Sequence, residues 1–273
     1  MTPSIKIGNK VFIGNGEPLA LIGGPCVIES REHCKKMAVE ISKICSEAEI
    51  GYIFKASFDK ANRSSIDSYR GPGLDASIDT FNEIRDLTNV PVTTDIHESW
   101  QAERIGRAVD LIQIPAFLCR QTDLLTAAAK TNKPVSVKKG QFMSAYEMEN
   151  VVRKIQRNEN QDVILIERGN SFGYNNLIVD LRNIVIMRQF APVVFDATHS
   201  VQIPGGLKTK SGGDNKYIKY LARAAVSTGV DGIFLEIHDN PEEALCDGPN
   251  MIRLDELPSL LEELCKIDSI VRE

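Results

Sequence analysis

Several features that mark other classes of protein are scarce in this chain. Lysine and arginine number 32 against 37 acidic residues, so the net charge is −5. This excludes a general nucleic-acid binder, which needs a broad basic face. No run approaches the roughly 18 apolar residues of a membrane span, and residues 1–6 lack the apolar core of a signal peptide. We expect a cytoplasmic protein that binds neither nucleic acid nor membrane.

Other signatures are also missing. The six cysteines form no Cys-x-x-Cys pair, and a disulfide framework is not expected in a chain of 273 residues, so we expect reduced thiols. No Gly-x-Gly-x-x-Gly turn follows the first apolar run, which argues against a dinucleotide-binding open sheet. Linkers and low-complexity segments are absent. We therefore expect a single domain over residues 1–273.

The chain does contain a repeated alternation of short apolar runs and helical patterns, in a composition that is 42% hydrophobic. Parallel strands need helical crossovers, and eight of them close into a sheet without edges. The pattern predicts an α/β fold, a (β/α)₈ TIM barrel, with a doubly wound open sheet as the alternative. The predicted strands cover residues 19–23, 52–56, 90–94, 111–114, 134–137, 163–167, 193–195 and 232–236.

Two further patterns refine this architecture. Residues 4–13 alternate around a Gly-Asn-Lys turn, which predicts a β-hairpin over the N-terminal end of the barrel. We assign residues 1–17 to this hairpin and residues 19–273 to the barrel. Residues 30–48 predict an amphipathic helix, and Ser144 with Glu147 forms a capping box before another.

Residues 54–65 carry the strongest functional signal. Lys55, Lys60 and Arg63 lie within nine residues of one another, and Asp59 is the only carboxylate among them. Such cations are costly to bury without anionic partners. Arginine and lysine both suit phosphoryl and carboxylate oxygens, so the stretch predicts a site for an anionic substrate.

Polar side chains follow all eight predicted strands. In a barrel of this type the chemistry takes place at the carboxyl ends of the strands. A structural role is an alternative for any single one of these residues, but their presence at every strand end favours an enzyme. The set comprises Cys26, Lys55, Arg63, Asp95, His97, Gln113, Lys138, Lys139, Arg168, His199, Glu236 and His238.

Four of the polar residues are candidate ligands of a divalent metal. Cys26, His199, Glu236 and Asp247 combine thiolate, imidazole and carboxylate, which suit zinc, iron or manganese. His238 is an alternative ligand to Glu236. For Cys26 the alternative is a purely structural role as a small buried thiol. Glycine-dense residues 205–213 follow His199 and predict a lid over a bound ligand.

Seven ordered motifs resemble the 3-deoxy-D-manno-octulosonate 8-phosphate (Kdo8P) synthases. The resemblance runs from about residue 22 to residue 250. It implies a homotetrameric barrel that condenses phosphoenolpyruvate (PEP) with D-arabinose 5-phosphate, releases phosphate and supplies lipopolysaccharide synthesis. The motifs are residues 24–29, 54–65, 94–98, 113–124, 167–174, 195–200 and 246–249.

The same resemblance assigns roles to individual residues. It implies a divalent metal and no organic cofactor. His97 and Asp95 would lie near the reacting carbons, and the catalytic set is completed by Lys138, Cys26 and His199. Asn62, Arg63 and Ser64 would hold the aldose phosphate. The PEP site would comprise Lys55, Ser57, Lys60, Gln113, Ala116, Lys138 and Arg168, and the metal site Cys26, His199, Glu236 and Asp247.

The sequence combines features of two subclasses. Cys26 stands where a metal-independent subclass has Asn, and residues 207–210 resemble the metal-dependent pattern. Residues 246–249 instead resemble the metal-independent pattern. Cys26 leads us to expect the metal-dependent subclass.

Two other functions remain as alternatives. One is a 3-deoxy-D-arabino-heptulosonate 7-phosphate (DAHP) synthase that takes erythrose 4-phosphate. That family usually has a Lys-Pro-Arg turn where this chain has residues 60–63, and the longer turn with Asn62 favours the five-carbon aldose. The other is a non-catalytic barrel that binds sugar phosphates.

Overall fold

The structure, a computed structural model, describes residues 2–14, 16–63, 65–203 and 212–272. Eight parallel strands form its centre, and each one after the first pairs with the barrel strand that precedes it along the chain. β14 also pairs with both β3 and β11, so the sheet closes on itself. The barrel strands are β3 (Ala20–Gly24), β4 (Gly51–Lys55), β5 (Val92–Asp95), β6 (Leu111–Ile114), β7 (Val135–Lys138), β8 (Val163–Glu167), β11 (Val193–Asp196) and β14 (Gly232–His238).

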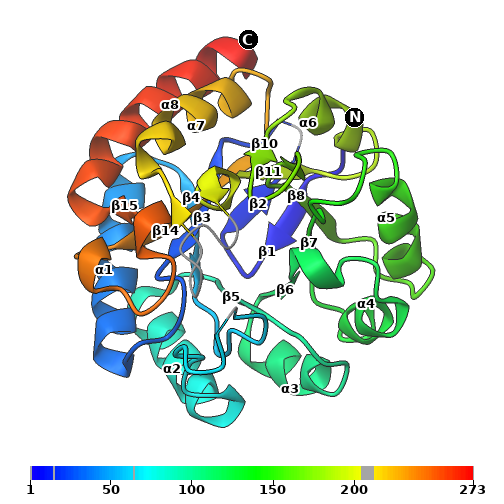
Figure 1. The fold of residues 1–273 in the computed structure, drawn as a ribbon. Coiled ribbons are helices and arrows are strands. Elements are labelled where there is room, and N and C mark those ends of the chain that lie inside the picture. Colours follow the sequence, from blue (N-terminus) through cyan, green and yellow to red (C-terminus); the bar gives the residue numbers. More distant parts are fainter. Residues whose placement is uncertain (1, 15, 64, 204–211, 273) are drawn as a thin grey trace.

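Helices surround this sheet on its outer side, as Figure 1 shows. The (β/α)₈ barrel expected from the sequence is confirmed, because each predicted strand overlaps an observed one. The helices are α1 (Arg31–Glu47), α2 (Leu74–Thr88), α3 (Gln101–Ala108), α4 (Thr122–Ala129), α5 (Met148–Gln156), α6 (Arg182–Met187), α7 (Ile218–Val226) and α8 (Leu257–Arg272).

Shorter elements lie mainly in the connections after the strands. Four of them form two antiparallel pairs, β9 with β10 and β12 with β13. β15 pairs in parallel with the end of β14. Their bounds are β9 (Asn170–Ser171), β10 (Leu177–Ile178), β12 (Gln202–Ile203), β13 (Gly212–Gly213), β15 (Ile252–Arg253), η1 (Ala116–Leu118), η2 (His199–Val201), η3 (Asn215–Tyr217), η4 (Pro241–Glu243), η5 (Gly248–Asn250) and η6 (Leu254–Glu256).

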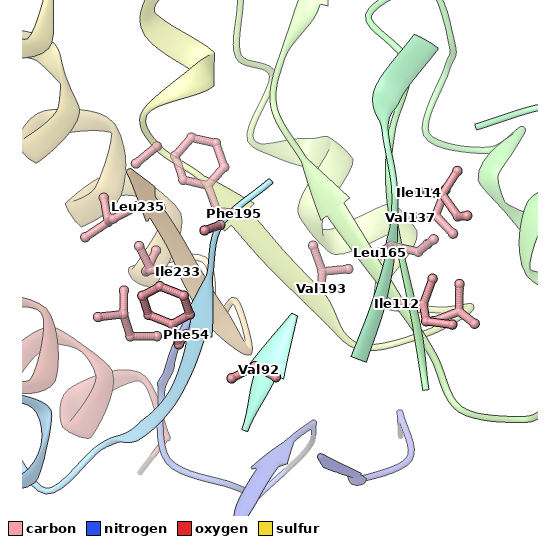
Figure 2. Packing of buried hydrophobic residues seen from close by; sticks show 14 of the residues in the cluster. Phe54, Val92, Ile112, Ile114, Val137, Leu165, Val193, Phe195, Ile233 and Leu235 are labelled. Atoms are coloured by element: carbon pink, nitrogen blue, oxygen red, sulfur yellow. The ribbon is translucent and has the colours of Figure 1, made fainter. Parts of the chain in front are cut away.

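The alternation of side chains along each strand separates two apolar layers. Side chains such as Phe54, Val92 and Phe195 belong to the layer between the sheet and the helices (Figure 2). Their neighbours on the strands, such as Ile53 and Val194, belong to a second cluster inside the barrel. Full burial of a side chain of this size stabilises the fold by roughly 1.5–3 kcal/mol. Because successive side chains of a strand point to opposite faces, only every second residue can reach the barrel interior.

The helix boundaries follow from local signals in the sequence. α1 begins after Ser30, whose Oγ accepts a hydrogen bond of 3.1 Å from the backbone N–H of His33. The predicted capping box also forms: Glu147 accepts from the N–H of Ser144, and Ser144 Oγ accepts from the N–H of Glu147. Regular α5 then begins at Met148, so the box belongs to the turn that leads into the helix.

The predicted hairpin consists of β1 (Ile5–Ile7) and β2 (Val11–Ile13). Its buried side chains, including Ile7, join the apolar cluster inside the barrel and close its N-terminal end. Gly8 makes the turn with a φ of +58°, where a Cβ would also lie 2.9 Å from the ring of Pro91. The hairpin is therefore confirmed. The division into residues 1–17 and 19–273 within one domain stays a prediction.

Among the described residues, none of the helices has the length and apolar content needed to cross a membrane.

Candidate active site

A cavity of about 820 Å³ lies at the carboxyl ends of the barrel strands. This volume is in the range that holds small ligands and cofactors. Cationic and polar side chains dominate the part of its wall that the strands supply. Among the residues that line it are Lys55, Lys60, Asn62, Arg63, Asp95, His97, Gln113, Ala116, Lys138, Arg168, His199, Cys246 and Asp247.

The strand period explains why these side chains meet. Inward positions are apolar near the start of each strand and polar near its end, as in β4, where Ile53 is followed two residues later by Lys55. In β8 the inward residues Ile164 and Ile166 are followed by Arg168, just past the strand. The folded chain therefore gathers its charges in one layer above the apolar interior.

Lys138, Asp196 and His199 form the most tightly connected group of the site. Lys138 Nζ lies 2.6 Å from Asp196 Oδ2, and the N–H of His199 donates to Asp196 Oδ1 at 2.9 Å. Burial would raise the pKa of Asp196, but the charges of His199 and Lys138 hold it well below its usual value. Burial also lowers the pKa of Lys138, and the carboxylate of Asp196 opposes that effect. The group thus holds a lysine that releases its proton more readily than usual.

A second group links the ends of β4 and β5. Ser57 Oγ donates to Asp95 Oδ1 at 2.5 Å and accepts from Lys55 Nζ at 2.9 Å. His97 Nε2 lies 3.1 Å from the other oxygen of Asp95. Burial would raise the pKa of Asp95, but the hydrogen bond from His97 and the charge of Lys55 keep it well below the usual value. Ser57 is fully buried and lies beneath the cavity, where it orients Lys55 and Asp95.

Two side chains of the cavity wall keep unused hydrogen-bonding capacity. Arg168 uses one terminal nitrogen to donate to His199 O and Gln202 Oε1, while its Nε has no partner among the described residues. The side-chain oxygen of Gln113 is also buried without a partner there. Buried polar groups are normally hydrogen-bonded, so these atoms mark places where a ligand would bind.

The four predicted metal ligands lie close together, with Asp247 at the centre. Cys26 Sγ lies 3.4 Å from Asp247 Oδ2, and His199 Nε2 lies 3.9 Å from the same oxygen. His199 Nε2 is also 3.3 Å from Glu236 Oε1. Asp247 thus belongs to two groups of donor atoms, one with Cys26 and Cys246 and the other with His199 and Glu236.

The buried carboxylate of Glu236 fits a cation. Neither of its oxygens accepts a well-formed hydrogen bond among the described residues, although Lys55 and Lys60 each have a nitrogen 3.8–3.9 Å away. Burial would raise the pKa of Glu236, but the charges of His199 and Lys60 hold it below the usual range. Burial raises the pKa of the Cys26 thiol, so a cation is needed to keep it as a thiolate. This donor set suits a borderline divalent metal.

The basic stretch from the sequence divides at the cavity. Lys55 and Lys60 lie on the side of Glu236, whereas Asn62 and Arg63 line the wall toward the loop after β14. Arg63 Nη1 donates to Cys246 Sγ at 2.6 Å. Ser64 and residues 205–211 of the expected lid lie outside the described residues.

Four residues of the strand-end set are not among those that line the cavity: Cys26 and Glu236, described above, and Lys139 and His238. Lys139 has the opposite orientation to Lys138, and its Nζ lies 3.6 Å from Glu167 behind the sheet. His238 belongs to a separate group with Glu29 and His33, so it does not take the place of Glu236 beside His199. Its Nδ1 also accepts the N–H of Asn240 at 2.9 Å.

The comparisons with known proteins place the chain in a family. A family model described as the DAHP synthetase I family matches residues 3–273.

The chain belongs to the DAHP synthetase I family.

Curated relatives are similar over nearly their whole length. A protein of a Cyanothece strain named 2-dehydro-3-deoxyphosphooctonate aldolase is 55% identical, over 96% of this chain and 97% of its own. A protein of a Geobacter species with the same name is 53% identical over 100% of both chains, and one of Desulfotalea psychrophila is 52% identical over 97% and 95%. That name is a synonym of Kdo8P synthase, so the resemblance found in the sequence is confirmed.

The sequence analysis assigned no role to two residues of the site, Asp196 and Cys246. Asp196 ends β11 two residues after inward Val194, so the spacing would have predicted that its side chain points into the barrel, where it contacts Lys138. Cys246 precedes a predicted ligand, but no periodic element carries it. Its contact with Cys26, 220 positions away, depends on the closure of the barrel.

Proposed function

We propose that the protein condenses PEP with D-arabinose 5-phosphate and water, giving Kdo8P and inorganic phosphate. The observation that carries the proposal is the convergence of buried Lys55, Lys138 and Arg168 and partly buried Lys60 on one cavity. Among the described residues, only Lys138 of these four lies within hydrogen-bonding distance of a carboxylate. Two phosphorylated substrates with one carboxylate provide anionic partners for the other cations. The relatives' shared name supports this substrate pair over erythrose 4-phosphate.

The PEP molecule binds against the strands in this proposal. Its carboxylate and phosphate bind Arg168, whose Nε lacks a partner among the described residues, and the ammonium groups of Lys55 and Lys138. Hydrogen bonds to charged groups are shorter and stronger than neutral ones and fix the orientation of a bound anion. The residues of this subsite are Lys55, Ser57, Lys60, Gln113, Ala116, Lys138 and Arg168, with Ser57 acting from beneath the cavity.

The aldose occupies the outer part of the cavity. Asn62 and Arg63 line that part and supply an amide and a guanidinium for the sugar chain and its phosphate. Ser64 completes the subsite in our proposal. His97 and Asp95 form a connected pair near the centre, where the reacting carbons meet.

The proposed reaction forms one C–C bond between the substrates and one C–O bond from water, and it breaks the C–O bond to phosphate. Carbon three of PEP attacks the aldehyde carbon, and water adds at carbon two. The tetrahedral intermediate then releases phosphate by cleavage of its C–O bond. Orientation of the two substrates and cations for the shifting negative charge lower the barrier. We assign to Lys138 the donation of a proton as PEP reacts, because its lowered pKa suits that task.

A divalent metal completes the site in this proposal. Cys26, His199, Glu236 and Asp247 would hold zinc, iron or manganese. When bound, such an ion polarises a substrate oxygen or acidifies a water molecule. No organic cofactor is needed for the bonds that form and break.

A phosphate-release assay tests the proposed function. PEP is incubated with the metal-loaded protein and either arabinose 5-phosphate, erythrose 4-phosphate or no aldose. We expect release only with the five-carbon aldose, together with formation of an eight-carbon product by mass spectrometry. Faster release with erythrose 4-phosphate would identify a DAHP synthase, and no release with either would favour a non-catalytic barrel.

Removal of the metal should abolish the activity. After exhaustive chelation and removal of the chelator we expect no phosphate release, followed by recovery when zinc, iron(II) or manganese is added. Loss without recovery in a protein that keeps its far-ultraviolet circular dichroism would point to damage other than metal loss. Activity that persists in fully chelated protein would refute the metal requirement.

We also propose a cytoplasmic homotetramer that serves lipopolysaccharide synthesis, as the resemblance implies. Exposed Tyr146 and Phe172 line a shared hollow with Ile178, and such apolar groups at a surface are typical of interfaces. Light scattering in solution should give a molar mass four times that of the chain; the mass of one chain would contradict the assembly.

A further inference from the structure

Cys246 lies between two elements of the site and has no role in the function proposed above. Its side chain is 2% exposed. Its Sγ lies 3.1 Å from Cys26 Sγ on one side and 2.6 Å from Arg63 Nη1 on the other. A guanidinium has donors and no acceptor, so the sulfur accepts this hydrogen bond.

The position of Cys246 matches that of a ligand. The sulfurs of Cys26 and Cys246 and a carboxylate oxygen of Asp247 all lie within 4.8 Å of one another. Asp247 is also part of the group with His199 and Glu236. Cys246 thus lies within 4.8 Å of the shared carboxylate, as the predicted ligand Cys26 also does.

The loop after β14 holds Cys246 and Asp247 in place. Asp247 has a φ of +50°, which turns the chain sharply after the cysteine. The N–H of Leu245 donates to Glu29 Oε1 at 2.9 Å, and a Cβ on Gly248 would lie 2.3 Å from Pro241 O. These constraints hold the side chains of Cys246 and Asp247 toward the barrel. A thiol with only a structural role would not require this double constraint.

We propose that Cys246 is a second thiolate donor of the metal centre, beside Cys26. This inference rests on the metal assigned under the proposed function and extends its donor set to Cys26, His199, Glu236, Asp247 and Cys246. Two soft sulfur donors favour zinc or iron(II) over manganese, which prefers oxygen donors. The donor set thereby narrows the range of metals that the four predicted ligands leave open.

Cobalt substitution counts the thiolates directly. Protein freed of metal is titrated with cobalt(II) under a phosphine reductant, and the near-ultraviolet sulfur-to-cobalt charge-transfer absorbance is measured per bound ion. We expect Cys246→Ser and Cys26→Ser each to lose about half of it, since each removes one of two thiolate ligands. The control Cys265→Ser, on α8, should keep the full absorbance. Full absorbance in Cys246→Ser would overturn the inference.

A second measurement avoids substitution altogether, in case Cys246→Ser does not fold. X-ray absorption at the zinc edge of the unmodified, zinc-loaded protein should show two sulfur neighbours at about 2.3 Å. One sulfur neighbour would overturn the inference, and phosphate release by the same sample would leave the proposed function intact. Absence of any bound metal in a sample that still releases phosphate would overturn both the inference and the metal assignment. No release from a sample with two sulfur neighbours would instead reject the proposed reaction alone.

Discussion

At the scale of single residues, the surroundings of Lys138 decide what its amine can do. Its Nζ lies 2.6 Å from Asp196 Oδ2 and 3.8 Å from the centroid of the Phe234 ring. The carboxylate and the ring face both favour a cation, whereas burial disfavours it. Burial prevails, and the pKa of Lys138 is lowered. The amine is therefore suited to donate a proton at neutral pH.

We predict that Lys138→Met abolishes phosphate release. Proton transfer by a positioned group contributes about 100- to 10,000-fold to turnover, and the substitution also removes a cation from the PEP subsite. Steady-state kinetics give the loss, with Lys130→Met as a matched control on the surface at the end of α4.

A second variant separates charge from proton transfer. Lys138→Arg keeps the positive charge beside Asp196 but holds its proton too tightly to donate it. We expect PEP to bind Lys138→Arg in isothermal calorimetry while turnover stays lost. Near-normal turnover in either variant would remove Lys138 from the proposed mechanism.

The sequence predicted residues at strand ends far better than residues in loops. Lys55, Asp95 and Gln113 occupy inward positions fixed by a period of two, and all three line the cavity. The placement of Cys246 depends instead on a turn at Asp247 and a hydrogen bond from Leu245 to Glu29. Such contacts join segments distant in sequence and leave no periodic signal.

At the scale of elements, the beginnings of the helices were predictable because they depend on neighbours a few residues apart. Ser30 and His33 form the N-terminal cap of α1, and Ser144 with Glu147 forms the capping box before α5. The exact ends were less certain: the strand predicted over residues 90–94 is β5 (Val92–Asp95). Pro91 precedes it and cannot donate to a strand ladder, which delays the first pairing.

We predict that Ser30→Ala lowers the free energy of unfolding by about 1 kcal/mol. The variant leaves the N–H of His33, at the first turn of α1, without its side-chain acceptor. Urea unfolding of the variant and the parent protein measures the difference. Ser259→Ala, at an exposed position of α8, removes the same hydroxyl group and should change stability by less than about 0.5 kcal/mol. Equal effects of the two substitutions would argue against the cap.

At the scale of the whole molecule, the hairpin and the barrel share one apolar interior. Ile5, Ile7 and Val11 pack in the same cluster as Ile22 and Phe234 of the barrel strands. The site sits at the opposite end of that interior. Closure of the barrel brings these parts together. It was predictable from the sequence, because the number and spacing of the eight apolar runs are enough to indicate a (β/α)₈ barrel.

We predict that Ile7→Ala destabilises the whole barrel by roughly 2–5 kcal/mol, because it leaves a cavity at a fully buried position. Chemical denaturation followed by far-ultraviolet circular dichroism measures the loss. Lys6→Ala, on the exposed side of the same strand, should have little effect. A loss confined to β1 and β2, with the barrel unchanged in hydrogen exchange, would show that the hairpin is an independent appendage.

The opposite orientations of Lys138 and Lys139 restrict how this chain can change in length. Gain or loss of a single residue within β7 would move one lysine out of the cavity and the other out of its pairing with Glu167. Two charges would then be buried without partners, a cost of several kcal/mol each. Insertions and deletions are therefore tolerable in the connections after the strands and not within them. A change of substrate during evolution would therefore have to come from changes in those connections, while the cations at the strand ends stay in place.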